Sequence, residues 1–562
     1  MAHLNPLALS PHEAKLVGRA RRLLTPRQKL AQLLHPVLWA HWDPSMPEEE
    51  LLERALEVPC GGYFMGKGGS DWMRQIVSEA QKRLPVKAVI SGDHEFGCQC
   101  DHGTGLGRAM NAGAIQPLED AVELAYHAGR CTAQECRASG IRWSLGPVLD
   151  LNLNPDNPIV NTRAFGGSHP TSAAAVAMAY ARGMQEQGMA ACMKHFPGDG
   201  ADARDQHSVT SINPLSEHDW METYGKAFQA GIDSGILSMM VGHIAWRTRS
   251  GRHPKTGFLL PATVDPRIQV DLLREELGFQ GLVLTDAIPM GGLQSHFSCE
   301  AEYVVETIRS GADMVLFPED LKTSVDALEK ALCDGYLSEK RVDDAFGRVL
   351  AFKAKLGLLD SEEETGDRFR PALSSPMEPR EKLEVSRRIA ERSVTLVRDL
   401  DGLYPLRLPE GSKLVLFEMP FDTPPRHSLL EAEGGDRLSP LETELRAAGY
   451  RTVVVRNQAD AERETADACA LFHLFFSTLS PRRGSIRLGR AAMDAIAWKR
   501  AYSGFPVYFV SFGNPYIVWE LGAIHNYVCC YSRQPQVIKA YARALLGQIP
   551  FRGKLPVDLP EQ

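Results

Sequence analysis

A short polar segment near the middle of the chain has residue types that suit proton transfer. An apolar run, 189–193, leads into Lys194-His195, and a proline and two glycines then end regular structure. Asp205 and His207 follow in the next polar loop. A carboxylate two residues from a histidine can bind one ring nitrogen and stabilise the imidazolium, which leaves the other nitrogen to exchange a proton. Spacing alone still favours two ordinary loop residues.

Asp286 is a candidate nucleophile. It directly follows the apolar residues 282–285, so a strand should fix its backbone. An ionised carboxylate held rigidly in a pocket can attack an electrophilic carbon, such as the anomeric carbon of a glycoside. Asp93, Asp150 and His243 also stand at or just past the ends of apolar runs.

The elements that would position these residues alternate between short apolar strands and helical segments. Strands are predicted at 61–65, 87–93, 142–150, 190–195, 235–243, 281–286 and 312–318, and helices at 10–35, 71–83, 118–139, 171–187, 220–234, 266–277, 300–310, 321–335 and 339–356. Apolar runs that are each followed by a helix indicate parallel strands buried on both faces. Seven or eight such units favour a (β/α)8 TIM-type barrel, in which the strand ends share one face and bring their polar residues into one pocket.

The chain changes character after residue 358. Residues 359–380 are acidic and then proline-rich, which indicates a linker. Residues 381–562 carry a second pattern of alternating strands and helices, typical of an α/β sandwich with a mostly parallel sheet. We therefore predict a catalytic barrel over 1–358, a linker over 359–380 and a sandwich domain over 381–562.

Composition excludes several classes of function. The 562 residues are 44% hydrophobic and 23% charged with a net charge of -8, which describes a globular chain with no basic block for nucleic acid or an anionic membrane. Residues 1–9 do not resemble a signal peptide, and no run of roughly 18 apolar residues indicates a membrane span. We expect a cytoplasmic protein with a small-molecule partner, and a homodimer remains open.

The chain offers no clear cofactor or metal motif. It has no Gly-x-Ser-x-Gly elbow and no Walker loop, and the glycines at 103, 105 and 107 fail the dinucleotide pattern at its third glycine. The 11 cysteines have no framework spacing and are expected to be free thiols. Cys98-x-Cys100 and Cys529-Cys530 lack a second pair at zinc spacing, so no metal site and no cofactor are expected.

Taken together, these segments resemble glycoside hydrolase family 3, and most closely its β-N-acetylglucosaminidase branch. That branch carries K-H-F-P-G-H-G followed by D-x-H. The matching segments here are 194–200, Asp205-Gln206-His207, Pro147 to Asp150, Asn157 to Gly166, Thr285 to Met290 and Gly553 to Val557. The resemblance covers most of the chain.

The resemblance implies a retaining, exo-acting β-glycosidase that works by double displacement on a carbohydrate substrate. Asp286 would be the nucleophile, and Asp205 with His207 would form the acid/base dyad on a mobile loop. The residues implied to bind the sugar are Asp93, Arg163, Lys194, His195 and Met290. Other branches take a glutamate from the second domain. Glu433-Gly434-Gly435-Asp436-Arg437 looks similar to that motif, but its early position predicts a surface segment, and 480–485 holds no acid.

Three departures from the branch bear on the sugar. Cys98 and Asp101 stand where relatives carry arginines, and Arg108 is a candidate replacement. Asp199 stands where they carry histidine, and Ala287 where a second acid is common. The sequence therefore predicts a β-N-acetylglucosaminidase first, with a β-glucosidase or an amino-sugar glycosidase as alternatives. A glycoside phosphorylase on the same scaffold and a silent sugar-binding protein also remain open.

Overall fold

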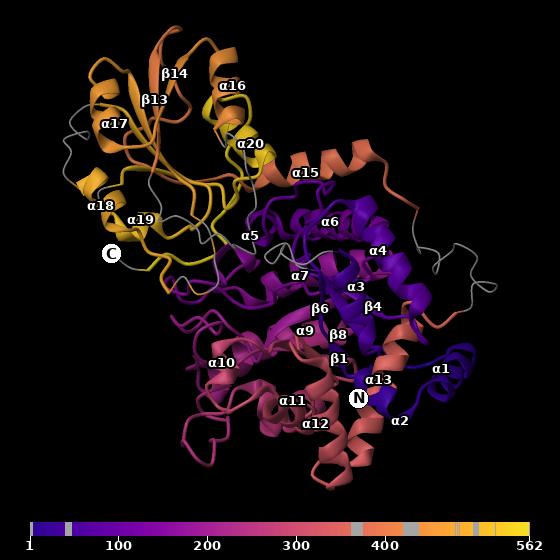
Figure 1. Cartoon of the computed structure of the whole chain (residues 1–562). Coiled ribbons are helices and arrows are strands. Elements are labelled where there is room, and N and C mark those ends of the chain that lie inside the picture. Colours follow the sequence, from indigo (N-terminus) through magenta and orange to yellow (C-terminus); the bar gives the residue numbers. More distant parts are fainter. Residues whose placement is uncertain are drawn as a thin grey trace.

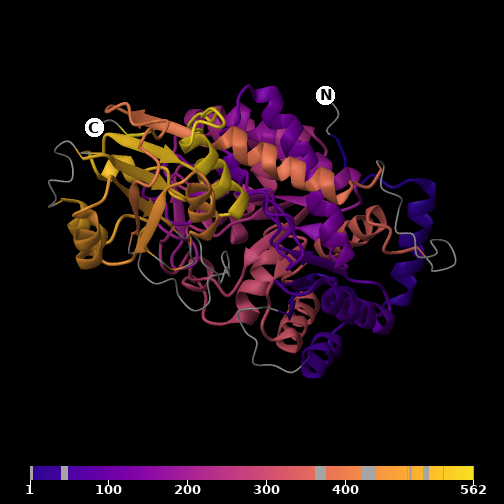
Figure 2. The same ribbon diagram turned by 90° about the horizontal axis from the view of Figure 1, so that it is seen from above.

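The computed structural model describes residues 4–560 except 40–47, 361–374, 420–437, 478, 480, 481, 483, 498–504 and 523. Two sheets organise these residues (Figure 1). The indigo-to-pink part of the chain forms a barrel, and the orange-to-yellow part forms a second layered unit at one side of it. Figure 2, seen from above, shows the same separation.

The barrel sheet is parallel throughout. Its strands, in sheet order, are β1 (Leu34–His35), β11 (Met314–Leu316), β10 (Leu282–Ala287), β8 (Ser238–Val241), β6 (Ala190–Phe196), β5 (Trp143–Ser144), β4 (Val89–Gly92), β3 (Gly62–Met65) and β2 (Val37–Trp39). The two ends of this order, β1 and β2, are separated only by Pro36, which has no N–H to donate. The two segments thus act as one interrupted strand, and the barrel closes through it.

Helices surround the barrel. They are α1 (Pro11–Leu23), α2 (Pro26–Ala31), α3 (Glu48–Glu57), α4 (Ser70–Arg83), α5 (Ala109–Gly113), α6 (Leu118–Ala138), α7 (Pro170–Glu186), α8 (Glu217–Trp220), α9 (Lys226–Asp233), the π-helical η4 (Arg267–Glu276), α10 (Gly291–Gln294), α11 (Glu300–Arg309), α12 (Leu321–Cys333) and α13 (Glu339–Lys355). A short two-stranded sheet, β7 (Ser211–Asn213) with β9 (Ile244–Trp246), lies above the strand ends.

Two predicted elements of the barrel are wrong in part. The stretch 10–35 is not one helix, because Leu24 is extended after α1 and the chain enters strand β1 after α2. The predicted strand 142–150 is reduced to β5 and one isolated bridge between Val148 and Lys194. Gly146 and Pro147 interrupt it, since proline cannot donate to a sheet ladder.

The second sheet has six strands. In order they are β12 (Thr395–Asp399), β17 (Asn526–Cys529), β16 (Val507–Ser511), β15 (Ala470–Phe475), β13 (Lys413–Glu418) and β14 (Arg451–Val455). Only the β12–β17 pair is antiparallel. Its helices are α15 (Pro379–Ser393), α16 (Ser439–Ala447), α17 (Gln458–Thr465), α18 (Arg490–Ala497), α19 (Ile517–Glu520) and α20 (Pro535–Leu545).

Side chains of the second sheet are buried on both faces. Along β13, Leu414 and Leu416 pack on the side of α16 and α20, whereas Val415 and Phe417 pack on the side of α17 and α18. This arrangement confirms the predicted fold class, a (β/α)8 barrel followed by an α/β sandwich with a mostly parallel sheet. The domain limits stay predictions, because 361–374 of the linker lie outside the described residues. The segment Glu433 to Arg437 lies outside them too.

The last segment of the chain docks onto the barrel. Lys554 N–H donates to Ala114 O at 2.9 Å, and Gly167 N–H donates to Pro556 O at 3.0 Å. A Cβ at Gly553 would lie 2.1 Å from Ser393 O, so this close approach requires glycine. The closing G-K-L-P motif therefore joins the two units. Among the described residues, no helix is both long and apolar enough to cross a membrane.

Asp313, just before β11, gives a test of how the barrel is held together. Its buried carboxylate accepts hydrogen bonds from Arg274 at 2.7 Å, Arg341 at 2.6 Å and Arg348 at 3.2 Å. Burial raises the pKa of Asp313, but the arginines outweigh burial and hold it below its usual value. Asp313→Ala should lower the free energy of unfolding by about 3–5 kcal/mol, because it leaves three largely buried guanidinium groups without their shared partner.

Urea unfolding followed by circular dichroism measures this loss. Because the folded pKa of Asp313 is lowered, its contribution should be present at neutral pH and lost as the pH falls through that pKa. Asp326→Ala is the control, since Asp326 pairs with Arg27 at the exposed surface, and it should change stability by less than about 0.5 kcal/mol. Equal losses in both variants would contradict this account.

Candidate active site

The carboxyl ends of three barrel strands bring the predicted site residues to one rim. Asp93 directly follows β4. Lys194 and His195 are among the last three residues of β6, and Asp286 stands near the end of β10. Asp93 keeps a side chain that is 37% exposed, whereas that of Asp286 is 12% exposed. The rim therefore offers partly accessible carboxylates on a rigid, buried support.

A buried ion network fixes one side of the rim. Glu95 accepts two hydrogen bonds from the Arg163 guanidinium, at 2.6 and 2.9 Å, and lies 2.9 Å from Lys194 Nζ. Lys194 also donates to Asp93 at 3.1 Å. Burial lowers the pKa of Lys194, but Asp93 and Glu95 outweigh it and raise the pKa above its usual value. Lys194 is thus a permanent cation with a fixed position.

His195 is oriented by a carboxylate beneath it. Asp150 Oδ2 lies 2.6 Å from His195 Nδ1, and Asp150 Oδ1 accepts the backbone N–H groups of His195 and Asp199. His195 Nε2 lies 3.8 Å from Asp286 Oδ2. Burial raises the pKa of Asp286, but the nearby side chains of His195, His243, His207 and Lys194 outweigh burial and hold it below its usual value. Asp286 is therefore ionised at neutral pH.

Asp205 and His207 form a direct pair. Asp205 Oδ1 lies 2.6 Å from His207 Nδ1 and also accepts the His207 backbone N–H. The other oxygen, Oδ2, accepts the backbone N–H of Arg482 at 2.7 Å. Burial raises the pKa of Asp205, but His207 and the Arg482 N–H lower it further than burial raises it. The second unit of the chain therefore contacts this pair directly.

Gln206, between them, fastens the same loop to the barrel. Its Nε2 donates to Asp199 Oδ2 at 3.2 Å, and its Oε1 accepts the His243 backbone N–H at 2.8 Å. The carbonyls of Gln206 and His207 accept the backbone N–H groups of Gly292 and Gly291, at 3.1 and 3.0 Å. The imidazole of His207 is held at Nδ1, and its side chain remains 21% exposed.

Asp199 does not reach the rim. Its carboxylate is buried and accepts from Asn157, Gly200 and Gln206. Burial and the nearby Asp150 carboxylate raise its pKa well above the usual range. The residue that stands where relatives carry histidine thus supports the loop of Asp205 and His207.

The remaining predicted residues lie close to these groups. Met290 is buried and stands at the N-cap position of α10, three residues after β10. His243, at the end of β8, donates from Nε2 to Ala287 O at 2.9 Å and so braces the residue after Asp286. Sequence reasoning missed Glu95, Gln206 and Arg482. Glu95 lies two residues after Asp93 and could have been found from the buried cations it must balance, whereas the contact of Arg482 carries no local sequence signal.

Comparisons with known proteins agree with this geometry. Residues 27–352 match the glycosyl hydrolase family 3 N terminal domain. A β-N-acetylglucosaminidase/β-glucosidase of Cellulomonas fimi is 31% identical over 526 residues, which are 90% of this chain and 89% of that protein. The chain belongs to glycoside hydrolase family 3. Beta-hexosaminidase A of Pseudoalteromonas piscicida is 22% identical over 87% of this chain and 85% of its own length.

Two solved structures resemble this family 3 chain over nearly its whole length. The β-glucoside phosphorylase BglX, bound to 2FGlc, is 27% identical with a TM-score of 0.86, covering 99% of this chain and 98% of that one. A β-N-acetylglucosaminidase from Paenibacillus sp. str. FPU-7 is 25% identical with a TM-score of 0.79, covering 95% and 99%. The chain is thus a family 3 β-glycosidase that acts on carbohydrate.

The bond between Asp199 and Gln206 predicts an effect on turnover without an effect on sugar choice. In Asp199→Asn an amide nitrogen would face Gln206 Nε2, so two donors would meet and the loop would lose one anchor. Because small misplacements of reacting groups are costly, kcat should fall about 10- to 100-fold. The dissociation constant of the product sugar should stay within about twofold, since the glycone side of the rim is untouched.

Steady-state kinetics and calorimetry of product binding measure the two quantities. Asp202→Asn is the matched control, because Asp202 lies on the same loop but bonds to Ile212 and Arg204 instead. A changed ranking of sugars in Asp199→Asn would show that Asp199 selects the substrate, and this account would then be wrong.

Proposed function

We propose that this chain is a retaining, exo-acting β-glycosidase that removes a terminal sugar by double displacement, with β-N-acetylglucosamine as the first candidate. The observation that carries the proposal is that the Asp205–His207 loop is bonded to the segment that follows the strand of Asp286, since Gly291 N–H donates to His207 O at 3.0 Å. His207 lies near enough to Asp286 to affect its pKa. A rigid ionised carboxylate can attack the anomeric carbon of a glycosidic bond, and a histidine bound to a carboxylate can protonate its leaving oxygen.

In the first step, Asp286 attacks the anomeric carbon while the leaving oxygen takes a proton from the Nε2 side of His207. Asp205 holds Nδ1 and stabilises the imidazolium before that transfer. A glycosyl ester on Asp286 results. In the second step, His207 removes a proton from the incoming acceptor, which displaces Asp286 and restores the starting configuration.

The remaining rim residues would bind the sugar. Lys194 has one N–H left after Asp93 and Glu95, and Asp93 is exposed enough to accept a hydroxyl. His195 presents Nε2 toward the same space as Asp286. Arg163 acts mainly through Glu95, since two of its nitrogens bind that carboxylate. Met290, which is buried just beyond the strand that carries Asp286, would form an apolar wall of the sugar site.

The identity of the sugar depends on the loop after β4. Cys98 is buried beside Cys136 of α6, so no polar side chain at this position reaches the rim. Asp101 is exposed in the following turn near Gly69. The Cellulomonas fimi relative is named for both N-acetylglucosamine and glucose substrates. Glucosides and amino-sugar glycosides are therefore the alternatives to test.

A glycoside phosphorylase is the second candidate function. The similarity to the β-glucoside phosphorylase BglX over 99% of this chain favours it. The charge of the acid/base group supports it too, because a neutral histidine repels an approaching phosphate less than a glutamate would. The anionic Asp205 is already bonded to His207 and to Arg482 N–H.

The cytoplasmic location and a homodimer stay predictions.

Removal of the acid should separate substrates by leaving group. His207→Ala should lower kcat/KM about 10²- to 10⁴-fold for glycosides with poor leaving groups, and much less for activated aryl glycosides. Asp286→Ala should abolish both activities. His218→Ala, an exposed histidine on α8, should leave both rates unchanged. An equal loss on both substrate types in His207→Ala would exclude His207 as the acid.

A panel of aryl glycosides, assayed with and without phosphate, should identify sugar and acceptor together. The panel is GlcNAc, glucose, glucosamine, xylose and galactose. A hydrolase should release free sugar at a rate that phosphate does not change. Faster turnover with phosphate and a sugar 1-phosphate product would establish the phosphorylase, and turnover of none of the five would sink both proposals.

A further inference from the structure

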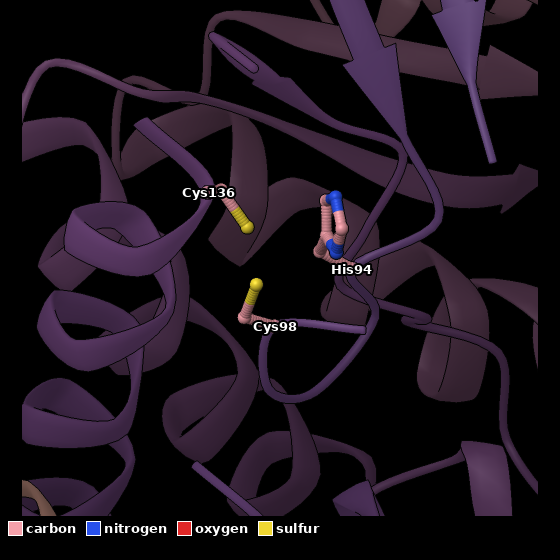
Figure 3. A group of neighbouring side chains, drawn as sticks. All are labelled: His94, Cys98 and Cys136. Atoms are coloured by element: carbon pink, nitrogen blue, oxygen red, sulfur yellow. The ribbon is translucent and has the colours of Figure 1, made fainter. Parts of the chain in front are cut away.

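Three side chains that the proposed reaction does not use meet between the loop after β4 and helix α6. A ring nitrogen of His94, Sγ of Cys98 and Sγ of Cys136 all lie within 4.8 Å of one another. In Figure 3 the two thiols point toward each other, and the His94 ring stands beside them. The Cys98 thiol also lies within hydrogen-bond reach of Cys100.

The three groups are buried, and the hydrogen bonding of the His94 ring is incomplete. Gln99 N–H donates to His94 Nδ1 at 3.1 Å, so the neutral ring carries its proton on Nε2, which has no hydrogen-bond partner within the described part of the chain. Burial lowers the pKa of His94 to about 3 and raises that of Cys136 to about 11. A neutral imidazole and two thiols are thus packed together, although an unpaired buried donor costs about 1–3 kcal/mol.

The donor set suits a thiophilic divalent cation. Two thiolates and one imidazole would balance the charge of a divalent ion, which favours a buried site. Zinc bonds of about 2.3 Å to sulfur and 2.0–2.1 Å to nitrogen place tetrahedral ligand atoms about 3.5–3.8 Å apart. Ligand atoms that already lie within 4.8 Å of one another need to approach by no more than about 1.3 Å.

We propose that His94, Cys98 and Cys136 form a binding site for one zinc-like divalent ion, with Cys100 or water in the fourth position. On binding, each of the two thiols releases one proton to solvent and the ion forms two sulfur bonds. The ring supplies its lone pair either at Nδ1, in exchange for the Gln99 bond, or at Nε2 after its proton moves to Nδ1. No electron is transferred.

This site would tie the substrate side of the barrel to its outer layer. His94 lies between Asp93 and Glu95, the carboxylates bonded to Lys194, whereas Cys136 is in the last turn of α6. An ion there would fix the loop of the rim against the helix. The role is structural, because the proposed reaction uses none of the three side chains. It is also independent of which sugar or acceptor the enzyme uses.

Cobalt is the probe, since its bonds to thiolate give a charge-transfer absorption. Untagged full-length protein, purified with a thiol reductant that does not bind metals, should bind one Co²⁺ per chain with that absorption. Zn²⁺ should displace the cobalt and raise the melting temperature. Cys98→Ser and Cys136→Ser should each lower the cobalt affinity at least tenfold. Cys131→Ser is the matched control, a buried thiol on the same helix that bonds to Glu135 instead, and it should bind cobalt like the wild type.

Three results would overturn the proposal. The first is a folded wild-type protein that binds no stoichiometric cobalt. The second is a Cys98–Cys136 disulfide found by mass spectrometry of the unreduced chain. If a serine variant does not fold, X-ray absorption of cobalt-loaded wild type replaces it. At least two sulfur ligands are expected there, and a shell of only oxygen and nitrogen would contradict the site.

Discussion

The contact of Glu95 with both Arg163 and Lys194 is the interaction on which the glycone side of the site depends. Arg163, Lys194 and the Glu95 carboxylate are buried together at the rim beside the partly exposed Asp93, and each buried charge is acceptable there only because its partners neutralise it. The network draws on the loop after β4, the segment before α7 and strand β6, so it fixes three separate parts of the barrel in one geometry. Asp150 likewise fixes the ring of His195 by its contact with Nδ1. The positions that would hold a sugar are therefore set before any ligand arrives, which lowers the entropy cost of binding.

The opposite side of the site is built from a loop that several elements hold. Gln206 connects Asp199 to the end of β8, and the glycines of α10 bind the carbonyls of Gln206 and His207. The backbone N–H of Arg482, in the second unit, donates to Asp205, the carboxylate of the Asp205–His207 pair. In the proposed mechanism, the contribution of the sandwich that the described residues show is this backbone N–H, which positions Asp205.

Much of this arrangement could be predicted from the sequence. The barrel follows from apolar runs with polar ends, and the grouping of Asp93, His195 and Asp286 follows from the shared face of parallel strands. Strand β1 was missed because it is short and continues directly from α2, and the edge strand β12 was missed because it is only half buried. Glu95, Gln206 and Arg482 were missed because their roles depend on partners far away in sequence. Cys136 was missed as a partner of Cys98 for the same reason, since zinc spacing rules describe only local motifs.

The central claim is that Asp286 forms a covalent bond to the sugar. Mass spectrometry of the chain after inactivation by a fluorinated glycosyl donor, of the sugar that the panel selects, tests it most directly. Fluorine slows the breakdown of the glycosyl ester more than its formation, so the ester should accumulate. The account predicts one glycosyl unit per chain on the peptide that contains Asp286, with none on Asp205 or Asp93. An adduct on another residue, or a product of inverted anomeric configuration, would contradict it.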